Sequence, residues 1–490
     1  MGTRDALKMA MELFRNMQEN NLLPDSVTYT TLIHGWSRGV PHLARLPEGG
    51  HSAEQLLVEL EQLPPDRLRA NFSRTKVYNS VITAWSKSGE ADAAQRAESI
   101  LSKLEGKFFN GHTDARPDKT TFLCLIDAYA KARITDAEER CDALLVRMNH
   151  FKDVFQMQDL EPDRAVYNAV LNALAKSCQP NAPEKAEEIL TMMQTSPDEK
   201  LRPDIVTYST VIDCHTKCGD GSKKAVELLR FVEGTYRGGD ESLKPNPVFY
   251  SAIMQAWAKT ATKEGAEKAE DLLRRNQALY EEGYEYAKPH SILYNAVMDA
   301  IARTGDKSSG MRAEELLDEM ESLYQSGNEE MKPSRRSFNA VILAYRNEKD
   351  GGLKAEELLS RMEASATAGR YELAPDIVSY NCVIGAIVND SNEQDAADRA
   401  QALLDRMEER NIRPDGRTYS PVIELWLKRR DEKGHALAEM MLQQFLEKVE
   451  ANKKAHHKGY FYEEEVWDVI NAYRDTTGED LPSLDPKSNV

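Results

Sequence analysis

Apolar residues recur along almost the whole chain at the three- and four-residue spacing of amphipathic helices. In the segment that starts at Ile205, the residues Tyr208, Val211 and Ile212 share one helical face. After a polar break at residues 219–222, a second apolar face follows at the same spacing, made of Ala225, Leu228, Leu229 and Val232. The pattern therefore predicts two consecutive helices, which we call helix A and helix B.

This pair of helices is repeated. Helix B carries an Ala-x-x-Leu-Leu-x-x-Met pattern in several copies, and an aromatic residue marks the same position of each helix A. The ten aromatic residues are separated by 39 to 49 positions: Tyr29, Tyr78, Phe122, Tyr167, Tyr208, Tyr250, Tyr294, Phe338, Tyr380 and Tyr419. A fixed period of this size predicts an all-α solenoid, in which each helical hairpin buries its apolar face on the next one.

A proline precedes most A helices and is usually followed by Asp, as in Pro203-Asp204. Proline cannot continue helix B, and an Asp side chain can accept hydrogen bonds from the free amides at the start of the next helix. The Pro-Asp pairs are therefore expected to end one helix and cap the next.

Composition narrows the possible classes of protein. No apolar run approaches the roughly 20 residues needed to span a bilayer. Neither a disulfide framework nor a zinc site is indicated, since no CxxC pair occurs among the six cysteines: Cys124, Cys141, Cys178, Cys214, Cys218 and Cys382. The net charge of −18, taken as an average, argues against nucleic acid as a ligand.

The distribution of basic residues changes that picture. The residue nine positions after each aromatic is basic in eight of ten copies: Arg38, Lys87, Lys131, Lys176, Lys217, Lys259, Arg303 and Lys428, with Asn347 and Asn389 in the other two. Helical packing does not require this column, and basic groups repeated on one face suit the phosphates of a nucleic acid. The alternative is a solvated helix end where Lys favours the helix dipole.

The aromatic followed by Asn, Ser or Thr, the Val-Ile pair, the second-helix pattern and the terminal Pro-Asp together resemble the pentatricopeptide repeat family of RNA-binding proteins, as a P-type array with lengthened repeats. The resemblance extends from about residue 5 to residue 428. It implies a right-handed superhelical α-solenoid of stacked helix-turn-helix repeats. Its concave face, lined by the A helices, would bind single-stranded RNA at one base per repeat.

We expect three parts on this basis. Residues 1–25 would be the second helix of a partial repeat, with Ala10, Leu13, Phe14 and Met17 in its core. Residues 26–428 would be the repeat array, with inserts after helix B at residues 106–116 and 235–243 and after helix A at 39–50. Residues 429–490 would form a cap with a helix near 434–449, a basic stretch at 453–458 and a short helix containing Val466, Trp467, Ile470 and Tyr473.

In the family, the residue after the aromatic and the residue after the next proline together read one base. The resemblance assigns this role to Thr30, Asn79, Asp118, Asp163, Asn168, Asp204, Ser209, Asn246, Ser251, Asn295, Ser334, Asn339, Asp376, Asn381, Asp415 and Ser420. The residue two before the aromatic would wedge between bases, as an aliphatic side chain at Val27, Val206, Val248, Ile292 and Val378.

The family code makes the four Asn–Asp pairs uracil-preferring, namely Asn79 with Asp118, Asn168 with Asp204, Asn339 with Asp376, and Asn381 with Asp415. Ser209 with Asn246 resembles an adenine pair, and Asn295 with Ser334 a cytosine pair. The implied target is pyrimidine-rich, of the form ?-U-?-U-A-?-C-U-U-?. The alternative for each Asn is a local hydrogen bond to the backbone.

The sequence carries none of the motifs of a zinc deaminase, a P-loop enzyme, a nucleophile-elbow hydrolase or an HExxH protease. We therefore expect a monomer without enzymatic activity, cofactor or metal, and with no membrane contact. A protein partner would supply any catalysis. The resemblance implies RNA processing, stability or translation in a mitochondrion or chloroplast, although no presequence is visible before the array. The alternative function is a helical scaffold that binds a protein partner.

Overall fold

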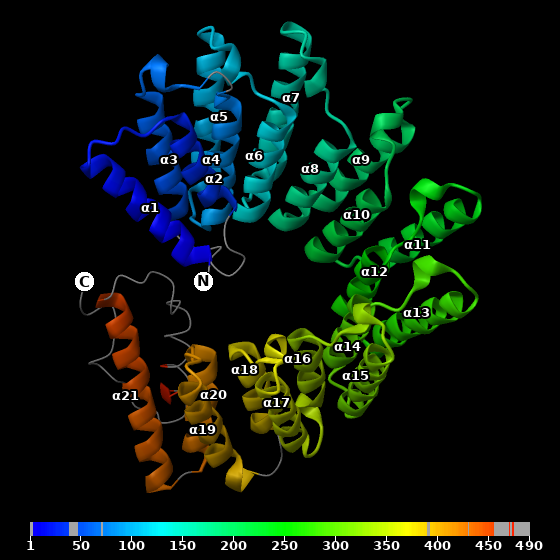
Figure 1. The fold of residues 1–490 in the computed structure, drawn as a ribbon. Coiled ribbons are helices and arrows are strands. Elements are labelled where there is room, and N and C mark those ends of the chain that lie inside the picture. Colours follow the sequence, from blue (N-terminus) through cyan, green and yellow to red (C-terminus); the bar gives the residue numbers. More distant parts are fainter. Residues whose placement is uncertain are drawn as a thin grey trace. The chain divides into compact units, whose positions relative to one another are not determined.

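The computed structural model describes residues 3–38, 48–69, 72–389, 393–429, 431–454, 470 and 473–474. These residues form twenty-one α-helices and nine short 3-10 helices, and no β-strand occurs in this part of the chain (Figure 1). The predicted all-α helical-repeat fold is confirmed.

The helices alternate between the A and B types along the chain. The A helices are α2 (Ser26–Arg38), α4 (Arg74–Ser88), α6 (Lys119–Ala132), α8 (Arg164–Ser177), α10 (Ile205–Cys218), α12 (Pro247–Lys259), α14 (Ser291–Thr304), α16 (Arg335–Ala344), α18 (Ile377–Asn389) and α20 (Gly416–Lys428). The B helices are α1 (Thr3–Glu19), α3 (Glu48–Glu61), α5 (Ala93–Phe109), α7 (Ala137–Val154), α9 (Ala182–Thr195), α11 (Ser222–Arg237), α13 (Lys263–Glu281), α15 (Ser309–Gln325), α17 (Gly351–Thr367), α19 (Glu393–Glu409) and α21 (Glu432–Lys454).

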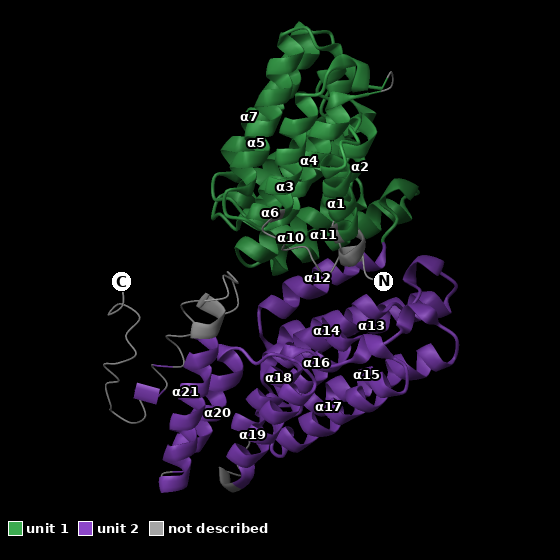
Figure 2. Cartoon of the chain, turned by 60° about the vertical axis from the view of Figure 1, so that its left-hand side comes forward, with its two compact units in different colours: residues 1–245 green, residues 246–490 purple. Residues whose placement is uncertain are grey.

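The chain divides into two compact units, residues 1–245 and 246–490, each with five A helices (Figure 2). Within each unit an A helix packs on the A helix of the next repeat and on its own B helix, as α4 does on α6 and α5. Nine of the ten register aromatics are buried at these contacts, and Tyr167 is half-buried. Each unit is therefore a stack of helical hairpins with its core between successive hairpins.

The lengthened repeats have an ordered end after helix B. In five of them a glycine with φ between +90° and +103° follows the helix: Gly111, Gly239, Gly283, Gly327 and Gly369. A one-turn 3-10 helix comes next in these five repeats, and also in the repeat of α7. Each of the six turns buries one apolar side chain: Ala115 (η2, Thr113–Ala115), Leu160 (η3, Gln158–Leu160), Leu243 (η5, Glu241–Leu243), Ala287 (η6, Glu285–Ala287), Met331 (η7, Glu329–Met331) and Leu373 (η9, Tyr371–Leu373). The remaining turns are η1 (Pro65–Arg67), η4 (Glu199–Leu201) and η8 (Tyr345–Asn347).

The expected inserts differ in part from this arrangement. Residues 106–109 continue α5 rather than leaving the helix, and residues 235–237 likewise belong to α11. In the insert after the first helix A, residues 39–47 lie outside the described residues, whereas Gly49 and Gly50 are already in α3. The added length therefore extends helix B before the chain turns.

Both ends of the chain follow the repeat pattern as far as they are described. Phe14 of α1 is buried and lies edge-on to Tyr29, with ring centroids 5.2 Å apart. Leu13, expected in the core, is instead 62% exposed, because the inward face of α1 is centred on Phe14. The expected C-terminal helix corresponds to α21, and Ile470 and Tyr473 are buried. Residues 455–458, Val466 and Trp467 lie outside the described residues.

None of the described helices combines the length and the apolar character needed to span a bilayer.

Candidate nucleic-acid interface

The N-cap position of helix A is the first element of the interface. The carboxylates of Asp118, Asp163, Asp204 and Asp415 accept a hydrogen bond from a backbone amide in the first turn of α6, α8, α10 and α20. Asp376 accepts the Ser379 amide at 3.0 Å. Asn246 caps α12 in the same way, with its side-chain oxygen 2.8 Å from the Phe249 nitrogen. The residue after the proline is thus the N-cap of helix A, as expected.

Three of the four Asn–Asp pairs assigned to uracil are joined by a direct hydrogen bond. The side-chain nitrogen of the Asn donates to the Asp carboxylate over 3.0 Å in Asn79–Asp118, 3.3 Å in Asn168–Asp204 and 3.2 Å in Asn381–Asp415. In the last two, a threonine of the next helix donates to the Asn oxygen over 2.7 Å, Thr207 and Thr418 respectively. The cap of one repeat therefore fixes the orientation of the amide in the repeat before it.

The fourth pair is arranged differently. No hydrogen bond joins Asn339 and Asp376, and the Asn339 side-chain oxygen is buried without a partner. The Asp376 carboxylate lies 2.9 Å from Arg335. Burial alone would raise the pKa of Asp376, yet the hydrogen bonds from Arg335 and from the Ser379 amide hold this pKa below its ordinary value.

A basic residue directly after the N-cap repeats this contact elsewhere. Lys119 lies 2.7 Å from Asp163, and Arg164 lies 3.2 Å from Asp204, one repeat further along. The repeat pattern alone does not distinguish these basic residues. Each follows a Pro-Asp pair directly, which is visible in the sequence. Its acidic partner, however, belongs to the next repeat and is distant in the sequence. Arg164 thus pairs with the carboxylate that orients the Asn168 side chain, whereas Lys119 pairs with the carboxylate that caps α8.

The other assigned reading residues do not form joined pairs. Ser209 and Asn246 belong to different units, and the Ser209 hydroxyl donates to the Ile205 carbonyl over 2.7 Å. Thr30 donates to the Ser26 carbonyl over 2.5 Å. The Asn295 side-chain oxygen is buried without a partner. Ser334 is held in the capping box of α16, Ser251 is buried, and Ser420 is half-buried.

The position two before the aromatic is open to solvent. Val27, Val206, Val248 and Val378 are 43%, 52%, 57% and 51% exposed, whereas Ile292 is half-buried. Each lies on the first turn of its helix A, three positions before the reading residue. Exposed valines recurring at one helical register are therefore placed beside the Asn and Ser side chains.

One residue at that position has a different partner. Arg336, which takes the place of the valine in its repeat, forms an ion pair of 2.6 Å with Asp299 of the preceding helix A. This contact joins two repeats and has no local signal in the sequence, because it depends on how the two helices stack.

The expected phosphate-binding residues share one end of helix A, but they differ in their partners. Arg38, Lys131, Lys217, Lys259, Arg303 and Lys428 are exposed, and Lys87 and Lys176 are half-buried. Lys131 and Lys217 lie 2.5 Å from Asp127 and Asp213, each four residues earlier. The Lys87 amine donates to the Ser37 and Arg38 carbonyls over 2.6 and 3.1 Å. Burial, and then the charge of Lys131, lower the pKa of Lys87.

The two amides in this column bond to each other, since Asn389 donates to Asn347 over 3.1 Å. Among the described residues, Lys176 and Arg303 form no ion pair. The expected column is thus present as a surface, but its charges are not equally available.

Acidic residues of the B helices are largely paired with the next repeat. Glu187 lies 2.8 Å from Lys224, and Glu356 lies 2.8 Å from Arg399. Glu363, 7% exposed, accepts the Tyr380 hydroxyl at 2.7 Å and also pairs with Arg406 and Arg410. Burial and then Glu363 raise the pKa of Tyr380 above its ordinary value. The B helices therefore carry a series of ion pairs between repeats.

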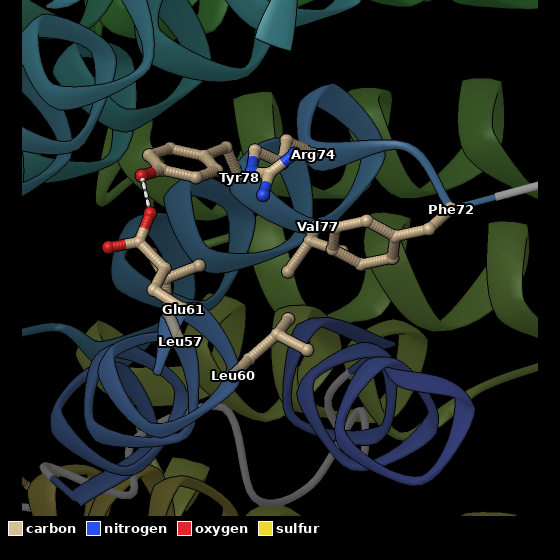
Figure 3. A pocket seen from close by; sticks show the side chains of 7 residues that line it. All are labelled: Leu57, Leu60, Glu61, Phe72, Arg74, Val77 and Tyr78. Carbon is tan, nitrogen blue, oxygen red and sulfur yellow. Dashed lines mark hydrogen bonds between the residues drawn. The ribbon is translucent and has the colours of Figure 1, made fainter. Parts of the chain in front are cut away.

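Two cavities lie among the described helices. A space of about 10 Å³, room for one water, lies where α3 meets α4, beside Phe72 and the hydrogen bond from Tyr78 to Glu61 (Figure 3). A second, of about 150 Å³, lies where α13 meets α15 and is lined by Glu270, Arg274 and Arg312 among others. Within the described residues, no three His, Cys, Asp or Glu side chains are grouped so as to hold a metal ion.

Comparison with known proteins identifies the repeats. Family models match three segments: a PPR repeat family over residues 1–38, a PPR repeat over 206–229 and a pentatricopeptide repeat domain over 366–429. No curated protein matches the chain significantly.

Among solved structures, the fold is similar to that of the pentatricopeptide repeat protein PPR10 from maize, with a TM-score of 0.52, 19% identity and 96% of this chain covered. PPR10 in complex with an 18-nt psaJ RNA element matches with a TM-score of 0.50, 20% identity and the same coverage. The chain spans 59% and 56% of the lengths of these two structures. The three family matches identify pentatricopeptide repeats in this chain, and the solved structures have the same helical-repeat fold.

Proposed function

We propose that this protein binds single-stranded RNA sequence-selectively along the exposed face of its A helices, with one base read per repeat. The observation that carries the proposal is the recurrence of half-exposed valines at one helical register. Each valine lies one helical turn before a polar side chain on the same helix A. A stack of hairpins does not need solvent-facing valines for its stability. Aliphatic side chains at a fixed spacing suit the faces of successive unstacked bases.

The oriented amides supply the base-reading chemistry. In Asn168, one side-chain N–H donates to Asp204 and one lone pair of the oxygen accepts from Thr207, which leaves the second lone pair to accept and the second N–H to donate. Such a donor suits a base that presents a carbonyl oxygen on its Watson–Crick edge, as uracil does. The Asn–Asp contacts therefore agree with the uracil preference that the family code assigns, and the proposed target is ?-U-?-U-A-?-C-U-U-?.

The reading pairs can be tested by exchanging one for another that the chain already contains. In the double variant N168S/D204N, the pair becomes the Ser and Asn found at Ser209 and Asn246. Asn246 shows that Asn can cap helix A, so the fold is expected to be retained. Selection from a randomised single-stranded RNA pool should change the fourth base of the target from U to A and leave the others unchanged. An unaltered preference at that base contradicts the assignment.

The phosphate-binding lysines are tested separately. Replacing Lys131, Lys176 and Lys217 with Ala should weaken binding to every RNA sequence and reduce the salt dependence of the affinity. The slope of log K against log salt should fall by up to about 0.7 for each phosphate that is no longer neutralised. Affinity measured by fluorescence anisotropy at several salt concentrations gives this slope. A slope equal to that of the unmodified protein would exclude these lysines from RNA binding.

The bound RNA would be a transcript of a mitochondrion or chloroplast, as the family resemblance implies, and binding would protect it or hold it open for processing or translation. The protein acts as a monomer without chemistry of its own, and a protein partner supplies any catalysis.

A protein ligand is the second candidate, favoured by an aromatic cluster on the B helices. The rings of Phe108, Phe109, Phe151 and Phe155 lie with centroids 5.5 to 6.1 Å apart at the ends of α5 and α7. Phe109 is 56% exposed. Failure of the purified protein to bind any RNA from the random pool at low salt would favour this scaffold function.

A further inference from the structure

Acidic side chains lie on the same face of helix A as the expected phosphate-binding residues. The residue four positions before the basic column is Asp in α6, α10 and α14, at Asp127, Asp213 and Asp299. Residues four apart are neighbours on a helix surface. A carboxylate here therefore faces the position where an RNA phosphate is proposed to bind.

In unit 1, two of these carboxylates hold the lysine of their own helix. Asp127 lies 2.5 Å from Lys131, and Asp213 lies 2.5 Å from Lys217. Asp127 is also fixed from the neighbouring repeat, because the Ser86 hydroxyl donates to the same carboxylate oxygen over 2.8 Å. Lys131 reaches Ser86 as well, at 3.2 Å. The lysine is thus held in a network that spans α4 and α6.

The helix between them has no carboxylate at this position. In α8 the corresponding residue is Asn172, and its Lys176 forms no ion pair within the described part of the chain. Three consecutive A helices therefore present a paired, an unpaired and a paired lysine. The contrast depends on a single change from Asp to Asn.

Unit 2 contains a related arrangement. Asp299 stands four residues before Arg303, but its carboxylate pairs with Arg336 of the next helix A at 2.6 Å. Arg303 forms no ion pair with a described residue. Here the Asp299 carboxylate neutralises Arg336, the residue two positions before the aromatic of its repeat, and does not pair with Arg303 of its own helix.

We propose that Asp127 and Asp213 compete internally with RNA phosphates for Lys131 and Lys217, so that Lys176 makes the dominant phosphate contact of α6, α8 and α10. The inference rests on the proposed RNA-binding function. A phosphate that approaches Lys131 competes with the Asp127 carboxylate for the ammonium group and is repelled by the negative charge of that carboxylate. The sequence-independent part of the affinity is therefore kept low, and stable binding depends on contacts with the bases.

The test changes the carboxylates without changing their shape. In D127N/D213N the two lysines become available, and the affinity for RNA of any sequence should rise about two- to fivefold per site at low salt. The slope of log K against log salt should become steeper by up to about 0.7 per site. The reverse variant N172D should give Lys176 a competitor, with weaker binding and a shallower slope.

Single lysine variants provide the internal comparison. K176A should reduce the salt slope more than K131A or K217A does. D127E, which keeps the negative charge, should bind like the unmodified protein. Thermal unfolding of each variant separates these effects from destabilisation of the network at Ser86, because a structural defect would lower the melting temperature without making the salt slope steeper.

Two different failures can be told apart. If the unmodified protein binds RNA but D127N/D213N and N172D leave the salt slope unchanged, the competition is disproved and the RNA-binding function stands. If the unmodified protein binds no RNA at low salt, both the function and the inference that rests on it are overturned.

Discussion

A single Asp side chain can make three different contacts at the start of helix A. Asp204 caps α10, accepts the Asn168 amide of the preceding repeat and lies 3.2 Å from Arg164. The sequence was sufficient to predict the cap, because Pro-Asp before an apolar helix is a local signal. The pairing of Lys131 with Asp127 was also readable from their four-residue spacing. The ion pair between Arg336 and Asp299 was not, since it depends on how two repeats stack.

The capping carboxylates predict a pH dependence of stability. The pKa of Asp376 is lowered in the folded protein, so its stabilising effect is fully present above the unfolded pKa of about 3.9 and is lost as the pH falls through the lower folded value. The variant D376N keeps a capping oxygen but has no charge to pair with Arg335. Its free energy of unfolding should therefore change less than that of the unmodified protein between about pH 5 and pH 3.

Chemical denaturation followed by circular dichroism at these two pH values measures the difference. Arg335→Gln is the matched control, because it removes the same ion pair from the other side. Equal losses of stability in all three proteins would show that Asp376 does not contribute.

At the scale of the element, the helices were predictable and the turns that join them were not. The apolar spacing in α10 and α11 is long enough to define both helices. A 3-10 turn such as η7 buries one side chain, Met331, and one residue produces no periodicity. The sequence therefore indicated an insert without showing that the insert is anchored in the core.

Removing that anchor should destabilise the protein. Met331 is fully buried, so Met331→Ala is expected to cost about 3 kcal/mol, because apolar burial is reduced and a cavity is left behind. Leu353→Ala is the control, because Leu353 is 54% exposed and its truncation should cost about 0.5 kcal/mol or less. Urea denaturation measures both. Equal effects of the two changes would mean that η7 is not held by Met331.

At the scale of the whole molecule, the repeat pattern predicted an all-α array, whereas the division of charge between the two units does not follow from that pattern. Residues 1–245 contain 31 Lys and Arg against 36 Asp and Glu, and residues 246–490 contain 32 against 45. Most of the acidic excess therefore belongs to unit 2. Many of these carboxylates pair with the B helix of the next repeat, and such pairs follow from the stacking of hairpins rather than from any local motif.

The pairs between repeats should differ in their importance according to burial. Glu363→Gln removes a buried carboxylate that pairs with Arg406 and Arg410, whose side chains are 34% and 40% exposed, and is expected to reduce the free energy of unfolding by about 2 kcal/mol. Glu357→Gln, which removes an exposed pair with Lys354, should cost less than about 1 kcal/mol. Thermal and urea unfolding of the two variants provide the comparison. A larger loss in the Glu357 variant would contradict it.

The hydrogen bond between Asn168 and Asp204 has a consequence for how such proteins can be rebuilt. The two residues of this proposed reading pair lie on either side of a repeat boundary, with one in α8 and the other at the start of α10. If a hairpin is duplicated or transplanted as a segment that runs from one proline to the next, the two residues are separated. Each then meets a residue from a different repeat. A module that carries its specificity with it has to be cut inside the first turn of helix A, after the capping residue.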